Sequence, residues 1–429
     1  MSTLTKSIKL KQKNSNSNTF KWWIGILLLF FAVGGYFILE RLIVGLTTTN
    51  LSSITPWGAW IAFYIFFVGL SAGSFLLSTM IFVFGMEQYE RVGKMALFTA
   101  IVCMIIALTF VLMDLGRPER AFNAMIYWNV TSVLAWEIHF YVVYIALLVV
   151  ELYIAMREDL VRLARATTNT FRNKVARMLT FKSSTINDHT KKRDHRWMKI
   201  LGTIGIPLAI LGVHGGTGAI FAVVSARESW NTGLFPIIFV VSAMVSGTAL
   251  LLAIYVIKNK AMKKPIDHQM VVSLAKMMVA FLFIDLLLQF YDLLVGWYSL
   301  ADTSLQSLGT MMGSSYSWSY WGVQMGIGAL IPIFLVFYKK TSHNINALLV
   351  AAVCVVIGII GVRFNIVVPS QIVPIMEGFP AGNYFPTFKE WMVSLGIVAM
   401  GLLIFTIGDQ LLPLEDDEPV EDWRDTNGK

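Results

Sequence analysis

Long apolar runs recur along the chain and are separated by short polar segments. Several runs exceed about 18 residues, which is enough for a helix to cross the hydrocarbon core of a bilayer. Strands of a membrane β-barrel are about ten residues long and alternate in polarity, so these runs do not fit a barrel. The pattern predicts ten membrane-spanning helices, near residues 22–47, 57–85, 95–114, 132–156, 200–224, 234–257, 272–299, 319–338, 346–368 and 391–412.

The composition agrees with this pattern. Of the 429 residues, 56% are hydrophobic and only 14% are charged, whereas soluble domains are about 25% charged. We therefore predict an all-α, polytopic membrane protein. The two cysteines, Cys103 and Cys354, both fall inside predicted spans and form no CxxC motif. The chain is accordingly expected to carry no iron–sulfur cluster and no zinc site of the usual spacing.

Basic residues gather in every second connection, which orients the chain. The basic N-terminus and the segments 86–94, 157–199, 258–265 and 338–344 hold most of the Lys and Arg residues. Because such segments stay on the cytoplasmic side, both termini are predicted to be cytoplasmic. The net charge of +8 thus reflects orientation and not nucleic-acid binding. The segment 157–199 is expected to lie partly as an amphipathic helix on the anionic inner leaflet.

Both ends of the chain support this placement. The first span follows a basic leader, but it is too long for the core of a signal peptide and lacks a small-residue cleavage site. We expect it to remain as an anchor. The short acidic stretch 415–422 is expected to be solvated. The host membrane is predicted to be the cytoplasmic membrane of a bacterium or archaeon.

Ionisable residues also occur inside the spans, where each costs roughly 2.5–3.5 kcal/mol or more and is a functional candidate. Most fall in the external half of the bilayer, as does Asp114 at the end of the third span. A cluster of this kind predicts a ligand pocket or a proton route. The alternative is that these residues only form structural ion pairs, of Asp114 with Arg117 or of Arg363 with Asp292, and carry no chemistry. The polar residues in the spans are Glu137, His139, His214, Asp285, Gln289, Asp292, Gln324, Arg363 and Asn365.

Two histidines raise the question of a haem. His139 and His214 have similar depths in adjacent spans, so one bis-His haem is conceivable. The other four histidines fall in cytoplasmic connections, which excludes a transmembrane pair of haems. We expect no haem, because lone polar residues in spans more often serve protons or hydrogen bonds.

A faint internal repeat runs through the chain. LGVHGG (211–216) resembles IGVRFN (360–365), which aligns His214 with Arg363. GLSAGSFLL (69–77) resembles MVSGTALLL (244–252) in the same order. Spans two to five and six to nine would then be two four-helix bundles in parallel orientation. The predicted division is 1–56 (N-terminus and anchor), 57–233 and 234–390 (the bundles), and 391–429 (last span and tail).

Four motifs in this sequence resemble one known family. They are PWGAWIAFYIFFVGLSAG (56–73), DLGRPER (114–120), NVTSVLAWE (129–137) and YFPTFKEWMVSLG (384–396). Together they are similar to the NrfD/PsrC family of respiratory membrane subunits, and most closely to its ten-span branch that includes HybB and DsrP. The resemblance covers nearly the whole chain.

The resemblance implies a subunit that exchanges electrons between the quinone or menaquinone pool and an external iron–sulfur partner. It implies that this chain is not catalytic alone and holds no haem or cluster of its own. The expected partner is a four-cluster ferredoxin-like subunit, docked on loops 114–131 and 367–390. A molybdopterin enzyme, a hydrogenase or a multihaem cytochrome would lie beyond it.

The resemblance also assigns candidate residues. Asp114 and Arg117 belong to DLGR, Glu137 matches an acidic position, and His214 and Arg363 fall at polar positions of the family. Tyr64 stands where HybB-like chains can have an acid. Hydrogen bonding to a quinone and acceptance of its protons require such side chains. The predicted quinone-binding residues are Tyr64, Asp114, Arg117, His214 and Arg363, and the predicted proton-transfer residues are Glu137, His139, Asp285 and Asp292.

The predicted proton route runs from Asp285 through Asp292 or Gln289 to Glu137, and it would make the reaction electrogenic. Two alternatives remain open for the whole chain. A secondary transporter also uses parallel repeats and buried charges, and a haem-bearing cytochrome b-type anchor would use His139 and His214.

Overall fold

The computed structural model describes residues 17–165, 170–180, 186–299 and 302–415. The basic leader before Ser17 and the acidic stretch after Glu415 lie outside the described residues. Within the described residues, every regular element is helical. The elements are α1 (Ser17–Val44), η1 (Leu46–Thr48), α2 (Ala59–Phe82), η2 (Glu87–Tyr89), α3 (Glu90–Asp114), η3 (Pro118–Arg120), α4 (Asn123–Ile126), α5 (Val133–Arg165), α6 (Phe171–Leu179), α7 (Asp188–Pro207), η4 (Leu208–His214), α8 (Gly215–Ala222), α9 (Phe235–Ala261), α10 (His268–Tyr298), α11 (Asp302–Gly313), η5 (Trp318–Leu330), α12 (Ile331–Phe337), α13 (Ile345–Ile372) and α14 (Phe388–Leu411).

Ten helices in the described part of the chain are long and apolar enough to cross a membrane. They match the ten predicted spans one for one, so the all-α, ten-span class is confirmed. α7, η4 and α8 together form the fifth span, and η5 with α12 forms the eighth. η4 and η5 are π-helical.

Two helices run well beyond their predicted bounds. α5 continues to Arg165 and α7 begins at Asp188, so both extend into the basic segment 157–199. Ion pairs join the two extensions: Arg157 pairs with Asp194, and Lys191 lies 3.0 Å from Glu158. α6, which holds the rest of the described segment, is a separate short helix between them.

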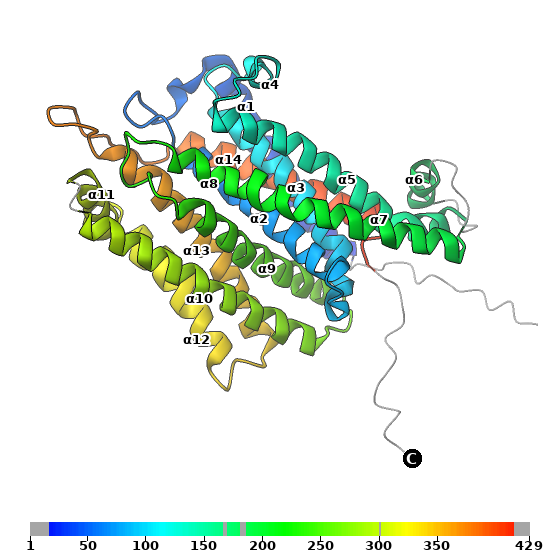
Figure 1. Cartoon of the computed structure of the whole chain (residues 1–429). Coiled ribbons are helices and arrows are strands. Elements are labelled where there is room, and N and C mark those ends of the chain that lie inside the picture. The colour runs from blue at the N-terminus through cyan, green and yellow to red at the C-terminus, as the bar shows by residue number, and fades with distance from the viewer. Residues whose placement is uncertain (1–16, 166–169, 181–185, 300–301, 416–429) are drawn as a thin grey trace, which may run out of the picture.

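The bundle has two ends, which we name by their sequence. The "motif face" carries the connections 45–58, 115–132, 223–234 and 373–387, including the DLGRPER motif. The "basic face" carries the connections 83–89, 262–267 and 338–344 together with the extensions of α5 and α7. Figure 1 shows α5 and α7 on one side of the bundle, α10 and α12 on the other, and α2 and α9 between them.

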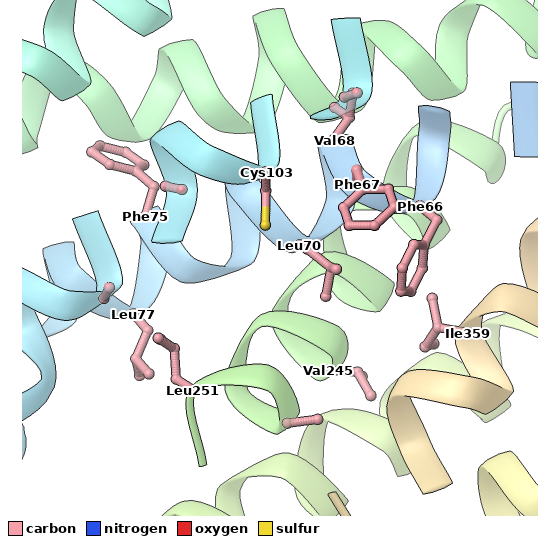
Figure 2. Packing of buried hydrophobic residues seen from close by; sticks show 14 of the residues in the cluster. Phe66, Phe67, Val68, Leu70, Phe75, Leu77, Cys103, Val245, Leu251 and Ile359 are labelled. Atoms are coloured by element: carbon pink, nitrogen blue, oxygen red, sulfur yellow. The ribbon is translucent and has the colours of Figure 1, made fainter. Parts of the chain in front are cut away.

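α2 is the central helix, and 89% of its most apolar window is buried within the protein. Its side chains Phe66 and Leu70 meet Val245 of α9 and Ile359 of α13 in the core (Figure 2). Close to these contacts the backbones of α2 and α9 touch, because a Cβ atom on Gly73 would lie 1.8 Å from the Ala243 carbonyl oxygen.

α1 and α14 form a flanking pair. Gly34 and Gly396 face each other, and a Cβ added to Gly34 would lie 2.3 Å from the Gly396 Cα. Small residues allow such close approach of helices in a membrane. The outer side of α1 exposes apolar side chains such as Leu29, which is 62% exposed, as expected for a surface that lipid covers. The division into two four-helix bundles stays a prediction.

Candidate functional site

Glu137 lies at the centre of a buried cluster of hydroxyl groups in the half of the bundle near the motif face. The residue is 2% exposed. The Tyr64 hydroxyl donates to its Oε2 at 2.9 Å, and the Tyr141 hydroxyl donates to its Oε1 at 2.6 Å. Thr217 also donates to Oε1. Three hydroxyls thus satisfy a carboxylate that would otherwise be costly at membrane depth.

The helices explain why these side chains meet. Tyr141 follows Glu137 by four residues on α5, so both lie on one face of that helix. α2 contributes Tyr64 from the opposite side, and its hydroxyl lies 2.6 Å from that of Tyr141. Because hydroxyls both donate and accept hydrogen bonds, this arrangement can pass a proton to or from Glu137.

A second buried cluster is centred on Arg363 of α13, whose side chain is 0% exposed. Its Nη2 donates to Ser242 at 2.9 Å and lies 3.4 Å from His214 Nε2. The guanidinium carbon lies 4.3 Å from the centre of the Phe239 ring, which is a cation–π contact. On α2, Gly69 makes room for the pair, because a Cβ there would approach His214 Cε1 to 3.2 Å.

The two clusters are neighbours. His214 ends η4 and Thr217 lies three residues later in α8, so the two side chains are about one helical turn apart in depth. α2 passes both clusters and contributes Tyr64 to one and Gly69 to the other. The structure therefore brings together four of the nine predicted residues, namely Tyr64, Glu137, His214 and Arg363.

Asp285 starts a hydrogen-bonded chain of amides in the second predicted bundle. Gln289 Nε2 donates to Asp285 Oδ2 at 2.6 Å, and Gln324 Nε2 donates to Gln289 Oε1 at 2.9 Å. Asn365 Nδ2 then donates to Gln324 Oε1 at 2.7 Å. Arg363 lies close enough to attract the Asp285 carboxylate.

This arrangement differs from two sequence expectations. Within the described residues, Arg363 contacts His214 and Ser242, and its charge acts on Asp285 and not on Asp292. The chain of amides leads from Asp285 to Asn365, and no hydrogen bond in the described structure continues it to Glu137. The predicted proton-transfer roles of Asp285 and Asp292 stay predictions.

Asp114 and Arg117 lie apart from both clusters, at the surface end of α3. Arg41 of α1 is the basic residue beside Asp114. Its Nε donates to the Met113 carbonyl at 2.7 Å, and its Nη2 donates to the Leu115 carbonyl. Arg117 is exposed at the start of η3. The backbone on either side of Asp114 is thus held by a residue distant in sequence, which the motif did not reveal.

His139 is half-buried and belongs to neither cluster. Its Nδ1 is 2.7 Å from the Ala135 carbonyl oxygen, and its ring stacks on Trp128 with centroids 4.4 Å apart. Two residues along a helix correspond to about 200° of rotation, so His139 faces away from Glu137. Its predicted role in proton transfer stays a prediction.

A further network at the motif face was not predicted from the sequence. The Tyr384 hydroxyl accepts from the Ala59 N–H at 2.8 Å and donates to Glu390 Oε1 at 2.6 Å. Burial, and next the Glu390 carboxylate, raise the pKa of Tyr384 above its ordinary value. The hydroxyl therefore remains a donor. This network fixes the start of α2, and hence the position of Tyr64 five residues later.

Comparisons with known proteins identify relatives over the whole length. The family described as "Polysulphide reductase, NrfD" matches residues 47–375. The chain is 38% identical to a selenate reductase subunit of Mesobacillus selenatarsenatis, over 95% of this chain and 97% of that protein. It is 26% identical to the Hdr-like menaquinol oxidoreductase integral membrane subunit of Archaeoglobus fulgidus, over 87% and 88%. It is also 26% identical to a putative dimethyl sulfoxide reductase membrane subunit of Halobacterium salinarum, over 92% of each chain.

Proposed function

Because this chain belongs to the NrfD family, we propose that it exchanges electrons between the quinone pool and an iron–sulfur partner on its motif face. The family assignment confirms the resemblance carried by the four sequence motifs. The relative named as a menaquinol oxidoreductase subunit supports menaquinol as the substrate class. The relatives named after selenate and dimethyl sulfoxide reductases support a terminal reductase beyond the partner.

The observation that carries the proposal is the Glu137 cluster beside the His214–Arg363 pair. Oxidation of a quinol to a quinone releases two electrons and two protons. Glu137, reached through the Tyr64 and Tyr141 hydroxyls, is a buried acceptor for one of those protons. About one helical turn from this cluster, His214 supplies a neutral hydrogen-bonding group and Arg363 supplies a charged one. In the reverse direction the same groups would deliver protons to a quinone.

The position of the cluster also supports exchange with a partner outside the membrane. Tyr64 lies five residues into α2, which corresponds to about 8 Å from the motif-face end of that helix. The motif face presents exposed apolar side chains on two connections, among them Phe122, Tyr127, Phe379 and Phe385. An aromatic, apolar surface of this kind suits protein docking.

The proposed partner is a four-cluster ferredoxin-like iron–sulfur subunit, and the motif face is proposed to be external because the basic connections lie at the other end. The enzyme beyond that partner is proposed to be a molybdopterin enzyme, a hydrogenase or a multihaem cytochrome. The chain itself is proposed to carry quinone as a substrate and no resident haem or cluster.

A matched pair of variants tests the location of the site. Glu137→Gln keeps the shape but removes the titratable proton. Glu151→Gln makes the same change in another buried glutamate of α5, which is also 2% exposed but lies about 21 Å nearer the basic face. In the purified complex, oxidation of menadiol should slow by about 100-fold or more in the first variant, as expected for a lost general base.

The Glu151→Gln variant should retain the rate of the unchanged complex. Equal rates in both variants and the unchanged complex would show that Glu137 accepts no proton from the quinol. Equal losses in both would show that the two glutamates act alike and that the site is not confined to the motif-face half.

The transporter alternative gains no support from the fold. Transporters often open the backbone at mid-membrane to coordinate a substrate. In the described spans the irregular stretches η4 and η5 are π-helical, so their backbone groups remain hydrogen-bonded within the helix.

A further inference from the structure

A cavity lies inside the second predicted bundle, between α9, α10, η5 and α13, and α11 covers it on the motif-face side. The cavity volume is about 90 Å³, several times the roughly 10–15 Å³ that one water requires. Leu293, Leu308, Met311 and Ile366 make part of its wall apolar, and Asp292 and Asn365 add polar groups.

The amide chain from Asp285 dictates which atom Asn365 leaves free. An ionised carboxylate only accepts hydrogen bonds, so Gln289 must direct its NH2 group to Asp285. Gln324 must then direct its NH2 to the Gln289 oxygen, and Asn365 its NH2 to the Gln324 oxygen, as the structure shows. The chain therefore ends in the Asn365 carbonyl oxygen, Oδ1.

That terminal oxygen is buried and unused. Asn365 is 4% exposed, and within the described structure its Oδ1 has no hydrogen-bond partner. A buried acceptor without a donor is unfavourable, so a ligand with an O–H group would be favoured there. Asp292, a second acceptor, lies three residues beyond Gln289 on α10 and also lines the cavity.

We infer that this cavity is a second quinol site, which binds the dihydroxy aromatic headgroup through Asn365 Oδ1 and Asp292. The inference rests on the proposed function, since the membrane pool supplies the ligand. Each of these acceptors suits an O–H group of a quinol, whereas a quinone has only carbonyl oxygens and would leave both acceptors without a donor. The site therefore prefers the reduced headgroup, and the apolar wall from Leu293 to Met311 accommodates the ring and the start of the tail.

Binding stoichiometry in the assembled complex, measured anaerobically in lipid nanodiscs, tests the inference. The probes are menadiol and its oxidised form, menadione. The unchanged complex should bind two menadiol molecules per chain. Leu308→Trp fills the cavity from α11 and keeps every residue of the amide chain, and it should bind one. Ser307→Phe fills the cavity from the same helix and should also bind one menadiol. It serves as the test if Leu308→Trp assembles poorly.

Asn365→Leu keeps the branching of the side chain at Cγ and removes the acceptor. At one of the two sites it should weaken menadiol binding by about tenfold or more, while menadione binding changes little. The unchanged complex could instead bind a single menadiol per chain. If Leu308→Trp and Ser307→Phe left that binding intact while Glu137→Gln weakened it, the second site would be overturned and the proposed function would stand. Complete absence of menadiol binding in the unchanged complex would overturn both.

Discussion

The Nε2 atom of His214 lies 3.4 Å from the Nη2 atom of Arg363, although 149 residues separate them in the chain. The internal repeat aligns the same two residues with each other. A two-fold relation between two bundles brings equivalent residues together near its axis, and α2 and α9, which the repeat also aligns, touch at Gly73 and Gly247. The division into two bundles stays a prediction, and it would account for the contact between these two residues.

Replacement of Arg363 is expected to destabilise the protein through the partners that it leaves behind. Arg363→Leu removes the donor to Ser242 and the positive charge near Asp285. Loss of a buried hydrogen bond from a charged group costs roughly 1.5–3 kcal/mol, and within the described structure the Asp285 carboxylate would keep no positive charge near it. Thermal unfolding of the purified protein in detergent should shift down by several degrees.

The double variant Arg363→Leu with Asp285→Asn removes the charge that the single variant leaves unpaired. It should recover part of the lost stability, with a coupling of roughly 0.5–3 kcal/mol between the two sites. Strict additivity of the two single changes would show that the two residues do not interact.

The contact between α2 and α9 depends on the absence of a side chain at Gly73. Gly73→Ala would place a Cβ atom 1.8 Å from the Ala243 carbonyl oxygen, which belongs to a backbone that cannot turn aside. Overpacking of this kind costs roughly 1–3 kcal/mol, and the melting temperature should fall. Gly35→Ala is the matched control, because a Cβ there meets nothing within 4 Å. If the melting temperature fell as far in Gly35→Ala as in Gly73→Ala, the effect would come from helix composition and not from the contact between α2 and α9.

The spans were predictable because hydropathy alone determines which helices cross a membrane. The extensions of α5 and α7 were not, because their charged residues are held by ion pairs with other helices, such as Arg157 with Asp194 and Asp159 with Lys94. A charged residue in a span is conspicuous, which made Glu137 and Arg363 easy to identify.

Residues whose importance depends on a distant partner were harder to find. Tyr141 and Thr217 carry no charge, so hydropathy does not mark them. The spacing of four residues from Glu137 to Tyr141, and of three from His214 to Thr217, was the only available signal. The contact of Arg41 with the backbone around Asp114 was missed because Arg41 comes from another span, whereas Arg117 is merely the neighbour of Asp114 in sequence.

Tyr384 is expected to hold the start of α2 in place. Tyr384→Phe removes the acceptor of the buried Ala59 N–H and the donor to Glu390. An unsatisfied buried group costs about 1–3 kcal/mol, so the melting temperature should fall by several degrees. Tyr36→Phe makes the same chemical change in a side chain that is 66% exposed and should have no effect. Equal melting temperatures for the two variants would contradict a structural role of the hydroxyl.

The purified chain is expected to show no haem absorption. A bis-His haem needs two imidazoles that face one iron from opposite sides. His214 is directed into the core toward Arg363, whereas His139 is half-buried on the other side of α5 from Glu137 and stacks on Trp128. An absorption spectrum of the reduced and oxidised protein checks this. A haem Soret band that disappears in both His139→Ala and His214→Ala would establish the cytochrome alternative.

The end of the described chain supplies a prediction about pH. Burial alone would raise the pKa of Glu415, but Lys258, 2.5 Å away, and Lys264 outweigh it and lower the pKa to about 2. A lowered pKa means that the folded protein binds the proton less readily than the unfolded chain does.

The stabilisation from Glu415 is therefore complete above the ordinary value near 4.5 and is lost as the pH falls toward 2. Glu415→Gln should lower the melting temperature at pH 7, and its deficit relative to the unchanged protein should shrink between pH 5 and pH 3. Glu377→Gln, at an exposed residue of the motif face, should melt like the unchanged protein at each pH. Lys258 also pairs with Asp409 of α14. If the melting-temperature deficit of Glu415→Gln did not change with pH, Asp409 alone would neutralise Lys258.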